Sequence, residues 1–144
     1  MSSKYSLIEI HTDGGARGNP GLAAIGVFAT VDGNHLFSLS EKIGHTTNNV
    51  AEYTAVIRAL ETIQEKQLSS EKTRFVLDSE LIVRQITGTY KVKQPHLQEL
   101  RHQIVTLING LREQKILNQL VFVNVPREKN KDADKLVNDA LDKE

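Results

Sequence analysis

Hydrophobic residues alternate with a period of two near the start of the chain, which indicates β-strands. An apolar segment covers residues 5–10, and alternate positions within residues 23–31 share one face of a second strand. The Asp32-Gly33-Asn34 turn joins residues 27–31 to residues 35–43 as a β-hairpin. The pattern therefore predicts three antiparallel strands at the beginning of a domain.

A helical period replaces this alternation at residue 49 and continues to about residue 66. Asn49 with Glu52 three residues later has the spacing of a capping box, close to its Ser/Thr form. A short buried strand is expected over residues 73–77. Asp78-Ser79 then begins a helix that continues through residue 86 and stops at Gly88.

Apolar residues step by three and four positions over residues 97–111, which predicts a strongly amphipathic helix. Residues 120–125 form the last predicted strand, and residues 130–141 form the last predicted helix. The resulting order is βββ-α-β-α-α-β-α. This order predicts an α/β domain whose later crossovers suit parallel strands.

Composition restricts the possible functions only in part. The chain of 144 residues has the length of one domain, expected to span residues 1–144. Its 18 basic and 18 acidic residues cancel, so nucleic-acid contacts must depend on local geometry rather than on a global field. The absence of cysteine excludes disulfides and thiol chemistry. Apolar runs are too short to span a bilayer and Met1 precedes no signal-peptide core, so we expect a cytoplasmic monomer without a membrane partner.

Glycine and proline are concentrated in residues 14–21, directly after the first apolar strand and Asp13. We expect the strand to end at Asp13 and a turn to follow, because these residues favour turn conformations. A carboxylate next to glycines could bind a metal ion and let the phosphates of a nucleic acid approach the polypeptide closely. Alternatively, Asp13 is an ordinary aspartate in a turn. A nucleotide-binding glycine loop is excluded because a strand, not a helix, follows.

Three acids occupy positions that are unusual for solvated acids. Asp13 and Asp78 each follow an apolar strand, so parallel neighbouring strands would bring both carboxylates to one edge of the sheet. Glu52 shares with Ala55 and Val56 the helical stripe that must face the sheet. Alternatively, Glu52 leans out to water from the third helical position, and Asp78 caps the next helix. Clustered acids repel one another unless divalent cations balance them, and hard oxygen ligands suit Mg²⁺ or Mn²⁺.

The last helix carries two further candidates, Asp132 and Asp134. They flank its apolar stripe on opposite sides, so periodicity does not choose between them. Either residue could instead be a solvated acid of the first turn that the helix dipole favours.

Taken together, four segments of the chain resemble the type 1 ribonuclease H family. They are Thr12-Asp13-Gly14-Gly15 with Gly18-Asn19-Pro20-Gly21, Thr47-Asn48-Asn49-Val50-Ala51-Glu52, Leu77-Asp78-Ser79, and Asn130-Lys131-Asp132-Ala133-Asp134. Each segment alone is weak evidence, but their order and spacing cover residues 5–141. The resemblance implies a ribonuclease-H-like α/β fold. In this fold a five-stranded mixed sheet, with three antiparallel strands followed by parallel additions, is flanked by helices.

The resemblance also implies hydrolysis of the RNA strand of an RNA–DNA hybrid. By position, the family's catalytic, metal-binding carboxylates fall on Asp13, Glu52, Asp78 and Asp134, which favours Asp134 over Asp132. Two Mg²⁺ or Mn²⁺ ions about 3.5–4 Å apart can activate a water and stabilise the leaving oxygen of an in-line displacement. The products are then expected to carry 5′-phosphate and 3′-hydroxyl ends.

Contacts with the hybrid are implied in the same way. The 2′-hydroxyls in a wide, shallow minor groove report the type of sugar rather than the base sequence. In similar proteins, backbone or side chains at six of these positions line that groove or hold a phosphate: Gly14, Gly15, Asn19, Thr47, Asn48 and Asn49. Glu80 stands where relatives often place glutamine, so a hydrogen-bond donor is lost there, and Arg127 could neutralise a phosphate.

Two departures from the family pattern predict weaker substrate binding and slower turnover, with the chemistry retained. Residues 124–129 lack the histidine that many relatives carry in this loop, and Arg127 cannot act as a general base because it stays charged. Residues 89–93 join two helices directly, where some relatives have a basic protrusion that grips the duplex. Two alternatives stay open. One is a catalytically weak or inactive module that binds hybrids or protein partners, and the other is a nuclease for different duplexes or junctions.

Overall fold

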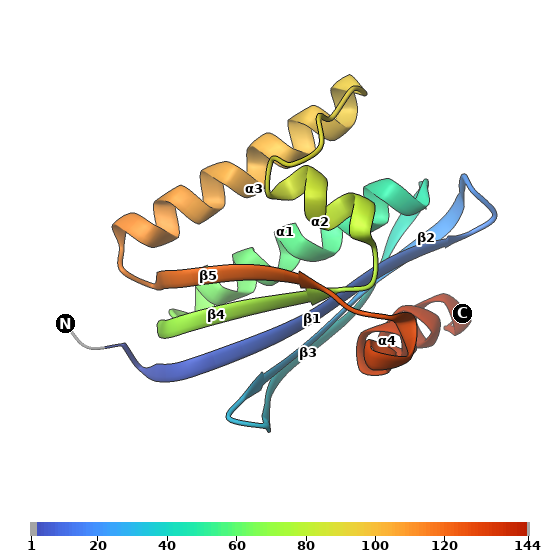
Figure 1. The fold of residues 1–144 in the computed structure, drawn as a ribbon. Coiled ribbons are helices and arrows are strands. Elements are labelled where there is room, and N and C mark those ends of the chain that lie inside the picture. Colours follow the sequence, from blue (N-terminus) through green and yellow to red (C-terminus); the bar gives the residue numbers. More distant parts are fainter. Residues whose placement is uncertain (1–2, 144) are drawn as a thin grey trace.

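The computed structural model describes residues 3–143 and contains one five-stranded mixed sheet in the order β3-β2-β1-β4-β5 (Figure 1). The first three strands pair antiparallel, whereas β4 and β5 run parallel to β1. This arrangement confirms the predicted fold class. The elements in chain order are β1 (Tyr5–Arg17), β2 (Gly21–Val31), β3 (Asn34–Thr46), α1 (Asn48–Lys66), β4 (Ser70–Leu77), α2 (Glu80–Ile86), α3 (Pro95–Glu113), β5 (Leu117–Asn124), the 3₁₀ turn η1 (Arg127–Lys129) and α4 (Lys131–Asp142).

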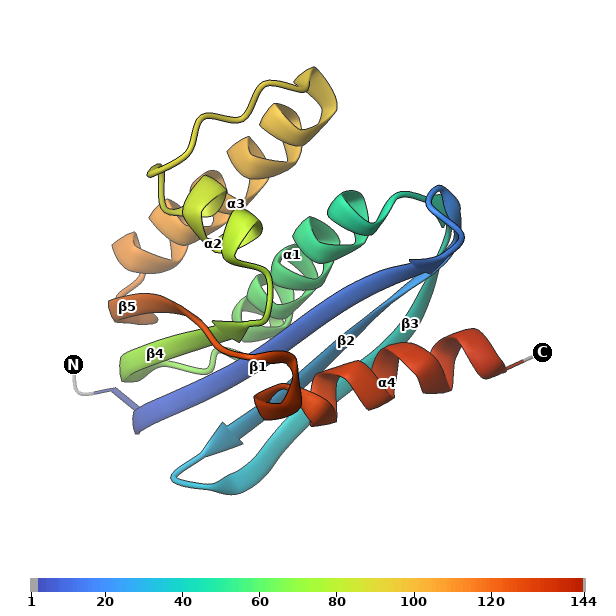
Figure 2. The same ribbon diagram turned by 45° about the vertical axis from the view of Figure 1, so that its right-hand side comes forward.

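Helices cover the two faces of the sheet unequally. On one face, α1 packs against β1 and β2 and α3 packs against α1, and their apolar side chains enclose the main core (Figure 2). On the other face, α4 lies across β2, β1 and β3, where Val137 and Ala140 contact Ala24. Within residues 3–143, no helix combines the length and the apolar character that crossing a bilayer requires.

The first strand is longer than predicted, and the expected turn after Asp13 is wrong. Instead of ending there, β1 continues through Arg17, with Asp13 paired to Gly26 and Gly14 paired to Ile25 of β2. Gly14 serves close packing rather than a turn, because a Cβ there would lie 2.3 Å from the backbone carbonyl of Ala51 in α1. The reversal of the chain occurs only at residues 18–20.

Both predicted helix starts need correction. Helix α1 is capped by Thr47, whose hydroxyl accepts a hydrogen bond from the Val50 amide at 3.2 Å, so the expected capping box at Asn49 is wrong. Helix α2 is capped by Ser79, which excludes Asp78 as its cap. Because Thr47 is the cap, Glu52 lies in the second turn of α1 instead of at its solvated start.

The two parallel strands begin earlier than the apolar pattern indicated. Strand β4 starts at Ser70 rather than at residue 73, and Ser70 pairs with Leu117 at the start of β5. Ser70 and Thr73 are fully buried, and their hydroxyls hydrogen-bond each other at 2.6 Å. Polar residues that satisfy one another in this way are compatible with a buried strand, so hydrophobicity alone missed its beginning.

We expect Gly26→Ala to destabilise the fold. A Cβ at Gly26 would lie 2.2 Å from the Ala133 carbonyl oxygen, so α4 would have to move off the sheet. The free energy of unfolding, measured by urea denaturation, should fall by about 1–3 kcal/mol or more. Gly110→Ala is the matched control, since nothing lies within 4 Å of its Cβ and alanine favours a helix, and it should raise stability by up to ~1 kcal/mol. Equal stability of the two variants would contradict the close packing of α4.

Candidate active site

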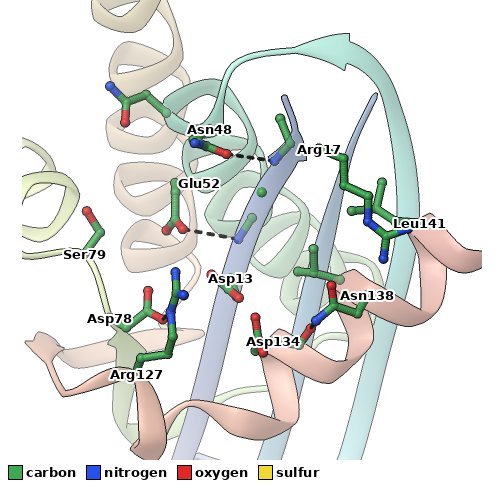
Figure 3. Close-up of a pocket in the computed structure, with 15 residues that line it drawn as sticks. Asp13, Arg17, Asn48, Glu52, Asp78, Ser79, Arg127, Asp134, Asn138 and Leu141 are labelled. Carbon is green, nitrogen blue, oxygen red and sulfur yellow. Dashed lines mark hydrogen bonds and ion pairs between the residues drawn. The ribbon is translucent and has the colours of Figure 1, made fainter. Parts of the chain in front are cut away.

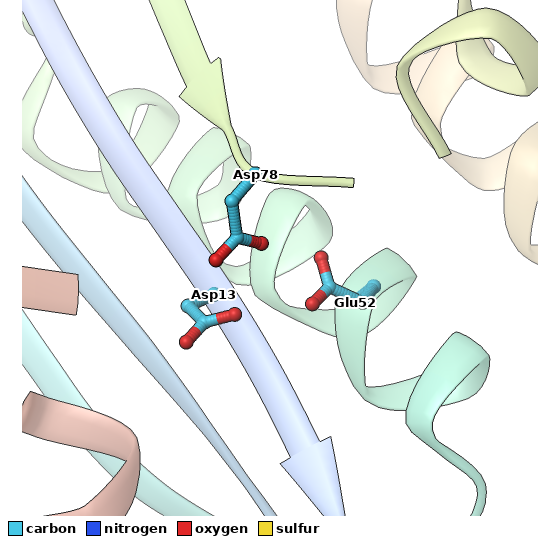
Figure 4. A group of neighbouring side chains, drawn as sticks. All are labelled: Asp13, Glu52 and Asp78. Atoms are coloured by element: carbon cyan, nitrogen blue, oxygen red, sulfur yellow. The ribbon is translucent and has the colours of Figure 1, made fainter. Parts of the chain in front are cut away.

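Asp13 and Asp78 come together because two parallel neighbours differ in length. The paired register of β1 and β4 ends at His11 and Val76, and β4 itself ends one residue later at Leu77. Two positions beyond the last pair, Asp13 in the continuing strand β1 stands beside Asp78 at the end of β4. Figure 4 shows both carboxylates turned toward the same space.

Glu52 reaches this space from helix α1 (Figure 4). Its side chain is 8% exposed, and the Gly14 amide donates a hydrogen bond to its Oε1 at 3.4 Å. The contact is possible because Gly14 has no side chain and the α1 backbone approaches β1 closely. The alternative of a solvated glutamate at the start of the helix is therefore excluded.

The three carboxylates of Asp13, Glu52 and Asp78 each place an oxygen within 4.8 Å of the others. Burial, followed by the negative charge of Asp78, raises the pKa of Asp13 from 3.8 to about 7. Burial and the charge of Asp13 raise the pKa of Glu52 well above its ordinary value. Burial also raises the pKa of Asp78, although the Arg127 guanidinium partly offsets this. The cluster is thus electrostatically unfavourable when it carries its full charge.

Two oxygens in the cluster are buried and have no hydrogen-bond partner, Oε2 of Glu52 and Oδ2 of Asp78. Buried polar atoms are normally satisfied, so unsatisfied oxygens on two carboxylates of one cluster point to a ligand that accepts both. A divalent cation would accept these oxygens and balance the charge, and hard carboxylate oxygens suit Mg²⁺ or Mn²⁺. The donor set therefore fits a metal centre.

The structure separates the two candidate acids of the last helix. Asp134 lines the cleft beside the cluster, and its negative charge contributes to the raised pKa of Asp13 (Figure 3). Asp132 is exposed and does not line the cleft. Asp134 lies on the opposite side of Asp13 from Glu52. Four segments therefore contribute one acid each: β1 contributes Asp13, α1 contributes Glu52, the end of β4 contributes Asp78, and α4 contributes Asp134.

A cleft of about 530 Å³ surrounds these acids and extends along β1 and α4. Arg127 stands at its mouth, with Nε 3.8 Å from Oδ2 of Asp78, which is too long for a hydrogen bond. The Arg127 side chain is 84% exposed, so the pair is screened by solvent. Arg127 is consequently available to an anion that enters the cleft.

Of the predicted contact residues, Gly14, Gly15, Asn48 and Asn49 also line the cleft. Asn48 accepts a hydrogen bond from the Ala16 amide at 2.8 Å and thereby ties the start of α1 to the end of β1 (Figure 3).

Three predicted contact residues lie outside the lining of the cleft. Thr47 caps α1, and Asn19 accepts a hydrogen bond from the Asn48 amide at 3.0 Å. Glu80 is exposed and pairs with Arg84 at 2.8 Å.

Several lining residues were missing from the sequence prediction. Ser79 follows Asp78 directly, and Arg17 and Asn138 form the wall toward the C-terminal end of α4 (Figure 3). Sequence spacing could have identified two of these residues, Arg17 and Asn138. Arg17 lies four residues after Asp13 in one strand, which places both on the same face, and Asn138 lies one helical turn after Asp134.

A family model and two curated relatives each match most of this chain. A family model described as reverse transcriptase-like matches residues 11–140. The bifunctional protein Rv2228c of Mycobacterium tuberculosis is 39% identical over 137 residues, which are 94% of this chain and 35% of that protein. Ribonuclease HI of Halobacterium salinarum is 37% identical over 136 residues, which are 94% of this chain and 64% of that protein. The chain thus spans between about one third and two thirds of the length of these curated relatives.

Solved structures match over nearly the whole chain. LC11-RNase H1, in complex with an RNA/DNA hybrid, has a TM-score of 0.84 at 51% identity, covering 94% of this chain and 96% of that chain. RNase H1 from Halobacterium salinarum has a TM-score of 0.85 at 34% identity, covering 95% and 98%. With the fold, the carboxylate cluster and these relationships in agreement, the chain belongs to the type 1 ribonuclease H family.

Proposed function

We propose that this protein is an endonuclease that hydrolyses the RNA strand of RNA–DNA hybrids with the help of two Mg²⁺ or Mn²⁺ ions. The observation that carries the proposal is the cluster of Asp13, Glu52 and Asp78, with oxygens within 4.8 Å of one another and two of them buried without partners. The hybrid bound by the similar LC11-RNase H1 supports the choice of substrate.

Asp13, Glu52 and Asp78 would hold the cations, and Asp134 would add a carboxylate from the opposite side of Asp13. When bound, the two ions would supply activation of a water and neutralisation of the leaving oxygen. Hydrolysis forms a bond between the water oxygen and phosphorus and breaks the bond to the 3′ oxygen. The products would therefore carry 5′-phosphate and 3′-hydroxyl ends.

Other residues of the cleft would hold the hybrid. Gly14, Gly15 and Asn49 all line the cleft, and a minor groove would lie against them there. Arg127 would bind a phosphate near the cluster, and since arginine stays charged it would not transfer a proton. Recognition of 2′-hydroxyls by such contacts distinguishes RNA from DNA without reading the base sequence.

Incubation of the purified protein with three labelled substrates tests the proposal. With Mg²⁺ or Mn²⁺, we expect cleavage of an RNA–DNA hybrid at internal ribonucleotides, leaving the end groups given above. Preferential cleavage of double-stranded RNA or of a four-way junction would instead support a nuclease for other structures. Binding of the hybrid without cleavage under either metal would support a non-catalytic module.

Asp13→Asn should reduce hybrid cleavage to background while the protein stays folded, because one metal-facing carboxylate becomes a neutral amide. Asp78→Asn should have the same effect. Asp132→Asn is the matched control, since Asp132 is exposed, and it should retain the wild-type rate. Initial rates with circular dichroism on each variant provide the measurement, and wild-type turnover by Asp13→Asn would refute the proposed metal centre.

The raised pKa of Asp13 predicts how stability depends on pH in the absence of metal. Between about pH 4 and about pH 7, folded Asp13 retains a proton that the unfolded chain releases, so its contribution to stability is lost as the pH rises through this range. Asn cannot ionise, and Asp13→Asn should therefore come closest to wild type near pH 4 and exceed it in stability near pH 8.

Urea denaturation in EDTA at the two pH values measures this difference, with Asp132→Asn as control for net charge. Adding Mg²⁺ near pH 8 should stabilise wild type more than Asp13→Asn, because only wild type keeps the complete cluster. A stability difference between Asp13→Asn and wild type that does not change with pH would contradict the buried, protonated state of Asp13.

A further inference from the structure

His11 takes part in an interaction that the proposed catalytic cluster does not explain. It lies in β1 two residues before Asp13, so by strand alternation both side chains project from the sheet face that carries α4. The His11 side chain is 20% exposed and has defined partners on both ring nitrogens. Nδ1 lies 3.0 Å from Oδ1 of Asn130, and Nε2 lies 3.0 Å from Oε1 of Glu9.

Asn130, the residue before α4, is fully buried and both ends of its amide have partners. Its Nδ2 donates a hydrogen bond to the Thr12 carbonyl oxygen at 2.9 Å. A carbonyl can only accept, so Oδ1 is the atom that faces His11, and Nδ1 of His11 is the donor of this second bond. The Asn130 side chain is therefore hydrogen-bonded to His11 and Thr12, the two residues of β1 that precede Asp13.

This use of Asn130 is unusual for a residue at the start of a helix. Asparagine at this position normally caps the helix by accepting a hydrogen bond from one of its first amides, and Asn130 makes no such bond. Its backbone carbonyl still accepts a hydrogen bond from the Asp134 amide at 3.1 Å. The side chain is therefore committed to β1, whereas the backbone begins the helical turn that carries Asp134.

Another hydrogen bond joins α4 to the sheet, from the Ser40 hydroxyl to the Leu136 carbonyl oxygen, beyond the first turn. The remaining contacts near the first turn are van der Waals packing. The backbone of Ala133 and Val137 lies over Gly26 of β2, and the Val137 side chain packs with Ala24. Such contacts set the distance of α4 from the sheet but have little directional preference, because the hydrophobic effect is not directional. Hydrogen bonds depend on angle and distance, so the bonds of Asn130 are better suited to determine where the first turn lies along β1.

We propose that His11 is a positioning residue that acts through Asn130, fixing the first turn of α4 on β1 and thereby placing the Asp134 carboxylate beside Asp13. This inference depends on the proposed function of Asp134 as a metal ligand. His11 itself does not line the cleft that holds the carboxylates. Glu9, which is paired in turn with Arg74 at 3.0 Å, holds the opposite side of the imidazole ring.

Two substitutions of His11 distinguish positioning from general stabilisation. His11→Phe keeps a ring of similar shape but no donor, whereas His11→Asn keeps an N–H donor near the position of Nδ1. His11→Phe leaves the buried Oδ1 of Asn130 without a donor, so it should lower the melting temperature. His11→Asn keeps the donor but places a residue that disfavours strands in β1, so it should lower the melting temperature as well. Because both variants lose stability, only the loss of the donor distinguishes them in Mn²⁺ affinity and kcat.

The decisive measurements are Mn²⁺ affinity of the full chain by calorimetry without substrate, and kcat and KM for a hybrid. His11→Phe should weaken Mn²⁺ binding and lower kcat by about three- to tenfold, less than the ~10–100-fold typical of a residue that contacts a metal ligand directly. KM should stay within about twofold of wild type, and His11→Asn should restore both Mn²⁺ affinity and kcat. Wild-type Mn²⁺ affinity and kcat in His11→Phe would overturn the proposal.

A second set of variants tests whether the effect passes through Asp134. In an Asp134→Asn background, His11→Phe should cause no further loss of Mn²⁺ affinity, and an equal further loss would overturn the proposal. Ser40→Ala is the matched control, because it removes a different bond between the sheet and α4, from the Ser40 hydroxyl to the Leu136 carbonyl oxygen at 2.6 Å. It should lower the melting temperature but preserve Mn²⁺ affinity. Failure of the proposed function is recognised separately, because wild type would then not cleave the hybrid, or Asp13→Asn would cleave it as fast as wild type does.

Discussion

Asp13, Glu52 and Asp78 are held closer together than the repulsion between their charges favours. Three carboxylates of like charge, with oxygens within 4.8 Å of one another, would separate if they were on flexible segments. Here each is carried by an element with its own reason to stay in place. A paired strand carries Asp13, a core-facing helix carries Glu52, and the end of a buried parallel strand carries Asp78. The core therefore sustains an arrangement that electrostatics alone opposes.

Two glycines allow helices to approach the sheet closely enough for this arrangement. Gly14 admits the backbone of α1 on one face, and Gly26 admits the backbone of α4 on the other. Glu52 and Asp134 consequently reach Asp13 from opposite sides of β1 (Figure 3). Oε2 of Glu52 and Oδ2 of Asp78 are buried without hydrogen-bond partners, and a divalent cation would accept both oxygens as ligands.

Much of the fold and of the site could be predicted from local pattern. The order of elements and the hairpin followed from periodicity and turn residues, whereas the five-stranded mixed sheet and the set of four acids followed from the resemblance to ribonuclease H. Errors occurred where a residue served a distant partner. Gly14 suggested a turn but accommodates Ala51 of α1, and Ser70 seemed too polar for a strand but is buried against Thr73. Such roles depend on contacts that a local window cannot contain.

Residue types alone indicated which chemistry is available: acids at the ends of apolar segments and no thiol. The resemblance added that Arg127 lies in a loop where many relatives carry a histidine. The sequence left open whether Glu52 was solvated, and periodicity did not separate Asp132 from Asp134. The packing of α1 buries Glu52, and the orientation of α4 places Asp134, but not Asp132, in the cleft. Tertiary structure also committed Asn130 to His11, 119 positions away in the chain. Periodicity describes one element at a time, whereas the distance between side chains of different elements is set only when those elements pack together.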